Sequence, residues 1–143
     1  MVSAVLDTVV FVRCMLNPRS IWGRVVFDRA VDYRLVVSPP VIAEVLDVLG
    51  RPAVTRKFRF VAGLDFRALL SILGNASVVQ PLPIPATSRD PNDDKFLATA
   101  LAANADYLVS EDNDLLVLGE YQGGRIVDAR TFLNLLEGDH SAR

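Results

Sequence analysis

Short apolar runs and longer amphipathic stretches alternate along the chain. The short runs are rich in β-branched residues and predict strands, the first from Ser3 to a carboxyl end near Asp7, the others at residues 34–38, 76–80, 106–110 and 124–128. The longer stretches have helical spacing and predict helices at residues 20–32, 38–50, 51–60, 64–73, 93–105, 114–121 and 129–138. This alternation predicts an α/β fold class, a three-layer α/β/α sandwich around a mostly parallel sheet of four to five strands.

The ends of these elements carry residues that favour helix starts and loops. Ser20 is a predicted N-cap, and Ser38 precedes two prolines that fit a first helical turn. Residues 81–92 are rich in proline and predict a loop inside the domain, since strand and helix patterns resume at once. The 143 residues fit one domain, predicted at residues 1–137 with a polar tail at 138–143.

The composition narrows the class of protein. Hydrophobic residues make up 51% of the chain and the mean hydropathy is +0.31, which is apolar for a soluble protein and compatible with a subunit interface. The formal net charge of −2 gives no global basic field, so a nucleic-acid partner needs a local basic patch. No apolar run reaches the ~20 residues of a membrane helix, and the N-terminus lacks the basic region of a signal peptide.

Two residue types that occur once restrict the chemistry. Cys14 is the only cysteine, which excludes an internal disulfide and suits a protein of the reducing cytoplasm. His140 is the only histidine and lies in the polar tail, so a Ser-His-Asp triad and a histidine-rich zinc site are excluded. The sequence also contains no P-loop and no G-x-G-x-x-G motif.

Carboxylates occur where an open parallel sheet binds ligands, at the carboxyl ends of its strands. Asp7 ends the first strand, residues 110–114 (SEDND) follow the fourth, and Glu44 lies in the helix entered from the second. Asp93 and Asp94 open the helix that leads into the fourth strand. Four separated segments can therefore bring carboxylates to one edge of the sheet.

Glu44 and Asp93 are placed unusually for solvated acids. On a helical wheel Glu44 lies beside a stripe of valines. Asp93 lies on the side of Phe96, and Lys95 points away from it. Carboxylates at the border of a core are costly unless they are paired or bind a metal, and clustered carboxylates repel one another. A divalent cation removes both costs, and oxygen ligands favour Mg²⁺ or Mn²⁺.

Most of these acids also have an ordinary structural interpretation. Asp90 fits a turn and cap before proline, and Asp93 and Asp94 can be charges that the helix dipole favours. Asp112 and Asp114 fit turn and cap positions, and a single glutamate on a helix is typical of a surface residue. The joint pattern is more specific than any of its members.

A basic stretch provides a candidate surface for nucleic acid. Residues 51–60 (RPAVTRKFRF) place phenylalanines between basic residues. Arginine pairs with phosphates, and exposed aromatic rings stack on bases. The alternative is a solvated helix whose phenylalanines belong to the core. The candidate RNA-binding residues are Arg13, Arg51, Arg56, Lys57 and Arg59.

Four segments together resemble the PIN-domain nucleases, and most closely the bacterial toxin branch of toxin–antitoxin pairs. The segments are VLDTVVFV (5–12), SPPVIAEVLDVL (38–49), DPNDDKFLATALAANADYLVSEDNDLL (90–116) and GRIVDARTFL (124–133). The resemblance covers nearly the whole chain, and the third segment is its most specific part. It implies an α/β/α fold with an acidic, metal-binding site that cuts RNA.

The resemblance also implies site residues, position by position. The implied catalytic acids are Asp7, Glu44, Asp94 and Asp112. The implied metal ligands are Asp7, Asp94 and Asp112, with Asp93 and Asp114 as neighbouring candidates. Ser110 matches a position that the family often fills with threonine or serine.

One position departs from the family pattern. Val9 stands where the family usually has an asparagine, two residues after the first aspartate. Valine cannot make the polar contact that an asparagine gives there. Thr8 can replace it in part, although strand alternation places its side chain on the opposite face from Asp7.

The function that the resemblance implies is a metal-dependent endoribonuclease with Mg²⁺ or Mn²⁺ as cofactor. Its implied partners are RNA, a cognate antitoxin that inserts a segment near the acidic site, and a second copy of the chain in a homodimer. Two alternatives stay open. One is a PIN-fold module that binds RNA or protein and has weak or lost catalysis, and the other is a non-toxic RNA-processing nuclease.

Overall fold

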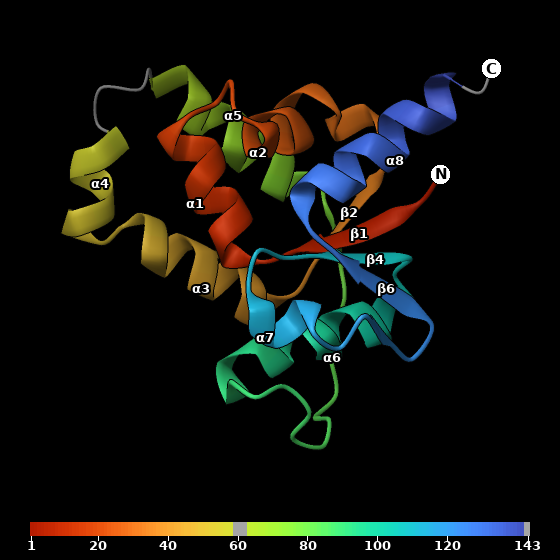
Figure 1. The fold of residues 1–143 in the computed structure, drawn as a ribbon. Helices are drawn as coiled ribbons and strands as arrows, with labels where there is room; N and C mark the ends of the chain where they lie inside the picture. The colour runs from red at the N-terminus through yellow and green to blue at the C-terminus, as the bar shows by residue number, and fades with distance from the viewer. Residues whose placement is uncertain (59–62, 142–143) are drawn as a thin grey trace.

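The chain folds around one sheet that carries helices on both faces (Figure 1). The computed structural model describes residues 1–58 and 63–141, and within them the strand order is β3-β2-β1-β4-β6-β5. The strands are β1 (Ser3–Leu6), β2 (Arg34–Val37), β3 (Ser77–Val78), β4 (Tyr107–Val109), β5 (Glu120–Tyr121) and β6 (Gly124–Val127). Neighbouring strands pair in parallel except β5 with β6. The predicted α/β class and mostly parallel sheet are confirmed, with six strands instead of four or five.

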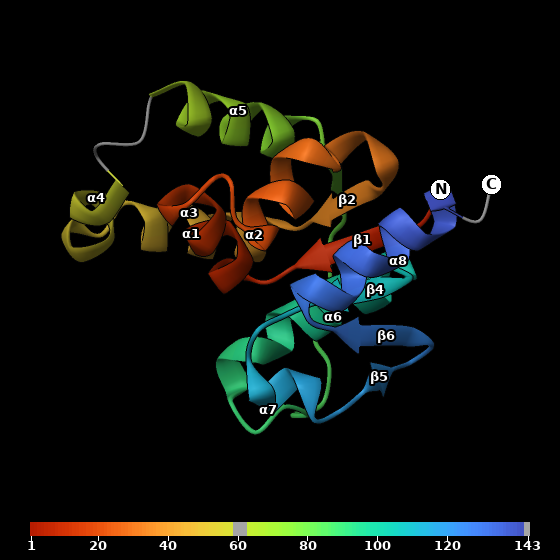
Figure 2. The same ribbon diagram turned by 45° about the horizontal axis from the view of Figure 1, so that its top comes forward.

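The helices form layers above and below this sheet. In the two views α6 covers one face, and α1, α2 and α8 cover the other (Figures 1 and 2). The α-helices are α1 (Thr8–Leu16), α2 (Ile21–Gly23), α3 (Pro39–Leu49), α4 (Pro52–Phe58), α5 (Gly63–Gly74), α6 (Asp94–Ala103), α7 (Asn113–Leu116) and α8 (Ala129–Ser141). Shorter turns are the π-helical η1 (Arg24–Asp28) and the 3₁₀ turns η2 (Ala30–Asp32) and η3 (Pro91–Asp93).

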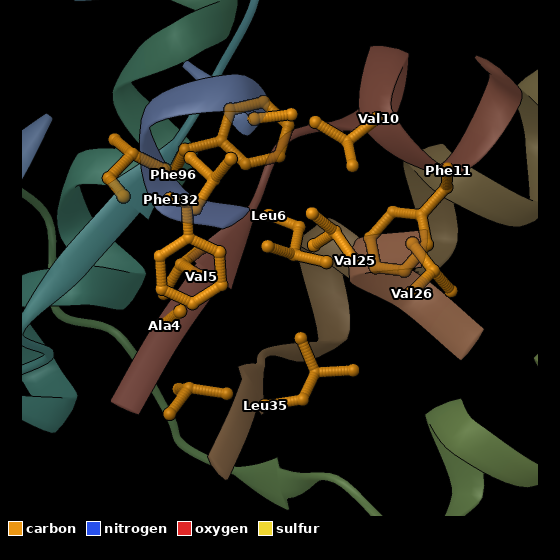
Figure 3. Close-up of a cluster of buried hydrophobic side chains, with 14 of the residues drawn as sticks. Ala4, Val5, Leu6, Val10, Phe11, Val25, Val26, Leu35, Phe96 and Phe132 are labelled. Atoms are coloured by element: carbon orange, nitrogen blue, oxygen red, sulfur yellow. The ribbon is translucent and has the colours of Figure 1, made fainter. Parts of the chain in front are cut away.

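Strand β1 lies in the middle of the sheet and determines where the core sits. All four of its residues are buried, and it pairs with β2 on one side and β4 on the other. Figure 3 shows side chains from both helical layers around it, including Phe11 of α1, Phe96 of α6 and Phe132 of α8. Each fully buried side chain of this size contributes about 1.5–3 kcal/mol to folding. The packed centre therefore fixes the carboxyl end of β1, where Asp7 lies.

Helix α1 was not expected from the sequence. Its β-branched residues favour a strand, but the chain leaves the sheet after Leu6 and becomes helical at Thr8. The Asp7 side chain caps the new helix by accepting a hydrogen bond from the Val10 amide at 3.2 Å. Tertiary packing then overrides propensity, because Val10 and Cys14 are fully buried against the core.

The segment predicted as one helix at residues 20–32 is divided into three short pieces, α2, η1 and η2. Ser20 caps α2 as predicted, since its hydroxyl accepts a hydrogen bond from the Gly23 amide. Gly23 lies so close to the preceding loop that an added Cβ would come within 1.9 Å of the Pro18 carbonyl oxygen. The close approach requires glycine and fixes α2 against that loop.

Three further boundaries differ from the sequence prediction. The helix expected at 114–121 ends at Leu116, and a turn through Gly119 (φ +72°) leads into β5, the added sheet-edge strand. Ser38 does not cap α3 with its side chain, because its buried hydroxyl bonds the Thr99 hydroxyl at 2.7 Å. Helix α8 extends to Ser141, past the helix end predicted at residue 138. None of the described helices has the length and hydropathy to span a bilayer.

Candidate metal centre

Four aspartates gather beside the sheet. Asp90, Asp93, Asp112 and Asp114 each place a carboxylate oxygen so that the four atoms lie within 4.8 Å of one another. Two segments far apart in the sequence provide them, the start of the η3–α6 helical segment and the start of α7 after β4. Four segments were expected from the sequence to bring acids to one edge of the sheet, and the cluster contains acids from two of them. We refer to these four residues as the aspartate cluster.

Backbone hydrogen bonds fix two members of the aspartate cluster. Asp90 accepts a bond from the Asn92 amide at 3.0 Å, so it does cap the turn, as the sequence suggested, while also belonging to the cluster. Asp112 accepts a bond from the Asp114 amide at 2.9 Å and caps α7. Helix starts tolerate carboxylates through the positive end of the dipole, so capping and ligand binding are compatible here.

Asp93 is the buried member of the aspartate cluster. Within the described residues its buried Oδ2 atom has no hydrogen-bond partner. Burial, the adjacent carboxylate of Asp112 and the charges of Asp90 and Asp7 together raise the pKa of Asp93 to about 7, with burial as the largest cause. A buried carboxylate oxygen without a donor, surrounded by other carboxylates, is a costly arrangement in the absence of a cation or a proton.

Asp7 adjoins the cluster and is held from three directions. Its Oδ2 accepts hydrogen bonds from the Ser110 hydroxyl and from the Glu111 amide, the latter at 3.3 Å, while Oδ1 accepts the Val10 amide. Burial raises the pKa of Asp7 to about 6, although these hydrogen bonds oppose the rise. Ser110 is itself fully buried, so the segment after β4 holds the Asp7 carboxylate in a fixed position.

Glu44 has partners outside the aspartate cluster. Its Oε2 accepts a hydrogen bond from the Thr8 hydroxyl, and its Oε1 pairs with Lys95 Nζ at 2.7 Å. Two expectations from the sequence are corrected by this arrangement. Thr8 begins helix α1 and does not alternate with Asp7 along a strand, and Lys95 reaches across to α3 instead of pointing away.

Asp94 also differs in its surroundings from its neighbour in the chain. Both of its carboxylate oxygens accept backbone hydrogen bonds, from the Thr87 amide at 3.2 Å and the Ser88 amide at 2.8 Å. These bonds tie the proline-rich loop to the start of α6. Asp94 therefore organises the loop, and Asp93 is the one that joins the aspartate cluster.

The described basic residues predicted to bind RNA lie on α1, at the junction of α3 and α4, and on α4. Arg51 pairs with Asp47 at 3.0 Å on the exposed side of α3, and Arg56 and Lys57 are exposed on α4. Arg59 lies outside the described residues, so its position is not part of the structure. Arg13 is exposed on α1, with its guanidinium carbon 4.8 Å from the ring centroid of Trp22.

Sequence reasoning missed two residues beside the site. Arg89 pairs with Asp114 at 3.0 Å. It lies in the proline-rich loop, where no sequence pattern indicated a site residue. Glu111 accepts hydrogen bonds from the Trp22 indole and the Ala129 amide, so it joins α2 to the start of α8. The sequence shows Glu111 among the acids of SEDND, but its partners Trp22 and Ala129 are distant along the chain and are seen only in the fold.

The donor set of the aspartate cluster fits a hard divalent cation. It consists of carboxylate oxygens from four side chains, and one of them is buried with no donor within the described residues. Mg²⁺, Mn²⁺ and Ca²⁺ prefer such ligands, and a bound cation would replace the missing hydrogen bond of Asp93.

Comparisons with known proteins agree with this fold. A family model described as "PIN domain" matches residues 3–114. The uncharacterized protein MJ1680 of Methanocaldococcus jannaschii is 30% identical over 123 residues, covering 82% of this chain and 75% of that protein. The crystal structure of PAE2754 from Pyrobaculum aerophilum has a TM-score of 0.58 at 18% identity, covering 96% of this chain and 90% of that chain, which shows a shared fold.

Proposed function

The chain belongs to the PIN domain family, and we propose that it is a metal-dependent endoribonuclease whose active site is the aspartate cluster together with Asp7. Family membership indicates a nuclease, and the cluster is a place where a metal can bind. The observation that carries the proposal is the buried, unpartnered Oδ2 of Asp93 among the other acids, within the described part of the chain.

The acids of the proposed site divide into metal ligands and residues that support the site without binding the ion. Asp93 and Asp112 hold a Mg²⁺ or Mn²⁺ ion, with Asp90 and Asp114 completing the ligand set. A divalent ion bound there supplies an activated water and neutralises charge on a phosphodiester. We place Asp94 outside the ligand set, because its two oxygens already accept the Thr87 and Ser88 amides.

Asp7 is proposed to orient the attacking water or to share the cation. Ser110 and the Glu111 amide hold Oδ2, so the carboxylate cannot rotate freely. Among the described residues Oδ1 accepts only the Val10 amide, which leaves a lone pair on that atom for a water or a cation. Glu44 shapes the neighbouring wall through Thr8 and does not need to touch the ion.

The biological setting is proposed from the resemblance to the toxin branch. In that setting the chain is a toxin of the cytoplasm, forms a homodimer, cleaves RNA and is inhibited by a cognate antitoxin. Expression that arrests growth, with relief by the product of a neighbouring small gene, would support the toxin role. Expression without growth defect would favour an RNA-processing nuclease instead.

A binding module with weak catalysis is the second candidate, and Val9 favours it. The side chain of Val9 is 37% exposed on the first turn of α1, two residues after Asp7, and offers no polar group. In that case the site would bind RNA or protein and cleave slowly. The acids of the aspartate cluster are all present, so the nuclease is the preferred proposal.

Cleavage assays separate these functions. Purified protein is incubated with mixed RNA in Mn²⁺, in Mg²⁺ and in chelator, beside Asp7→Asn and Asp93→Asn. The nuclease proposal expects cleavage only with divalent cation, and a loss of at least a hundredfold in each variant. Undiminished cleavage by both variants would refute the assigned site, and no cleavage by the wild type under any condition would favour the binding module.

A further inference from the structure

Trp22 is held rigidly at the edge of the candidate site. Its indole N–H donates a hydrogen bond to Glu111 Oε1 at 3.1 Å, and the same oxygen accepts the Ala129 amide at 2.9 Å. The capped start of α2 and the close approach of Gly23 to Pro18 fix the backbone beside it. A half-buried aromatic ring with this many restraints presents one face in a defined direction.

Arg13 lies over that ring. Its guanidinium carbon is 4.8 Å from the centroid of the Trp22 ring, and the side chain is exposed. Within residues 1–58 and 63–141 its guanidinium makes no ion pair and no hydrogen bond. A guanidinium held over an indole face by a cation–π interaction still has N–H groups that can donate to a phosphate.

The Arg13–Trp22 pair is close to the candidate metal centre. Glu111 touches both places, because its amide donates to Asp7 at 3.3 Å while its carboxylate accepts from Trp22. Arg13 is six residues after Asp7, which is about 9 Å of rise along the axis of α1 at 1.5 Å per residue. At the ~3.4 Å axial spacing of a stacked strand, this rise corresponds to two or three phosphates.

The acids at this edge create an electrostatic problem for any polyanion. The aspartate cluster, Asp7 and Glu111 concentrate negative charge, and the chain as a whole has a net charge of −2. A strand that crosses the cluster therefore needs a cation at its rim, and Arg13 is an unpaired one within the described residues. Its planar group matches two phosphate oxygens, which a solvated lysine does not do as well.

We propose that Arg13, oriented by Trp22, binds a phosphate of the RNA strand two or three nucleotides from the scissile bond and so determines where the strand crosses the site. The proposal rests on the proposed ribonuclease function. Arg13 is a substrate-binding residue in this view, and Trp22 is a positioning residue that acts through it.

Trp22 also provides the measurement, since it is the only tryptophan in the chain. A short single-stranded RNA of mixed sequence is titrated into the wild-type protein in chelator, where cleavage is not expected. Tryptophan fluorescence then reports on this place alone, and the anisotropy of a labelled copy of the RNA gives the affinity. We expect the RNA to change the Trp22 emission with the same midpoint as the anisotropy.

Four variants test the roles of the two residues. Arg13→Gln is expected to lower RNA affinity about tenfold and to reduce the slope of log affinity against log salt by about 0.7, as loss of one phosphate contact predicts. Arg13→Lys keeps the charge, so we expect the slope to be retained with part of the affinity lost. Trp22→Leu is expected to weaken binding without changing the slope. Arg34→Gln is the control that removes the same charge. Arg34 is at the amino end of β2, away from the candidate site at the carboxyl ends of the strands, so this variant should bind like wild type.

The outcomes separate this inference from the function on which it rests. RNA cleavage by the wild type, with unchanged binding and salt slope in Arg13→Gln, overturns the inference and leaves the nuclease intact. Binding that depends on Arg13, without cleavage in any cation, supports the phosphate contact of Arg13 and overturns the nuclease. Equal losses in Arg13→Gln and Arg34→Gln show a general charge effect and overturn the inference, and absence of both binding and cleavage overturns both proposals.

Discussion

Lys95 Nζ lies 2.7 Å from Oε1 of Glu44 and joins the first turn of α6 to α3 beside the aspartate cluster. Both side chains are about a quarter exposed, at 26% and 24%, so the pair is partly shielded from water. The second oxygen of Glu44 accepts the Thr8 hydroxyl, which extends the connection to α1. Three helices around the candidate site are therefore linked through one carboxylate.

The Glu44–Lys95 pair is expected to couple energetically. Glu44→Gln and Lys95→Met should each lower the free energy of unfolding, and the double variant should lose less than their sum by about 1 kcal/mol, because each single change leaves a partner unpaired. Urea unfolding of the four proteins at pH 7 measures this coupling. The exposed pair Asp47–Arg51, at 68% and 61% exposure, is the control and should show coupling near zero. Additive losses at Glu44 and Lys95 would contradict the prediction.

Asp93 and Asp94 are expected to respond oppositely to substitution. Asp93→Asn removes a buried charge that lacks a partner within the described residues, so the metal-free protein at pH 8 should gain on the order of 1 kcal/mol of stability and lose divalent-cation binding. Asp94→Ala removes the acceptor of the Thr87 and Ser88 amides, so it should cost about 1–3 kcal/mol and keep cation binding.

Thermal unfolding in chelator and calorimetric titration with Mn²⁺ check both halves of this prediction. The adjacent positions make each variant the control for the other. If Asp94→Ala lost the cation while Asp93→Asn kept it, the ligand would be Asp94, as the family pattern implies.

Much of the fold could be predicted from the sequence, because strand and helix patterns are local. The strands at Ser3–Leu6, Arg34–Val37 and Gly124–Val127 match the predicted apolar runs to within one residue at each end. Helix α1 could not be predicted, since β-branched residues favour a strand there. Its helical state depends on the Asp7 cap and on burial against the rest of the core.

The candidate site shows a second limit of sequence reasoning. Asp93 and Asp94 are adjacent, and successive side chains on a helix point about 100° apart, so one residue of register decides which of them enters the cluster. The 3₁₀ turn Pro91–Asp93 sets that register, and the sequence does not specify it. Lys95 was placed away from the core for a similar reason, because a wheel of α6 alone does not include α3.

The metal-free protein is expected to lose stability as the pH rises. Folding raises the pKa of Asp93 to about 7 and that of Asp7 to about 6, above the ordinary value of 3.8 in the unfolded chain. Between pH 4 and 7 the native state therefore binds more protons than the unfolded state, so these groups make the free energy of unfolding fall with pH.

Urea unfolding in chelator at a series of pH values measures this slope. Asp93→Asn should flatten it, so the difference between variant and wild type isolates the group from other titrations. Added Mn²⁺ should restore stability most strongly above pH 7, where the carboxylates are free of protons. Parallel curves for wild type and Asp93→Asn would contradict the assignment.

Val9 departs from the family pattern two residues after Asp7, where the family usually has an asparagine. Its side chain is 37% exposed on the first turn of α1, and valine and asparagine have similar helix propensities, so Val9→Asn should change stability by less than about 0.5 kcal/mol. We expect the added amide to make a polar contact at the site and to raise the rate of RNA cleavage about tenfold, the effect of one hydrogen bond of about 1.4 kcal/mol. Initial rates in Mn²⁺ measure this, with Val9→Ala as the control that removes the side chain without adding an amide. Equal rates for wild type and Val9→Asn would show that the carboxylates suffice without the asparagine.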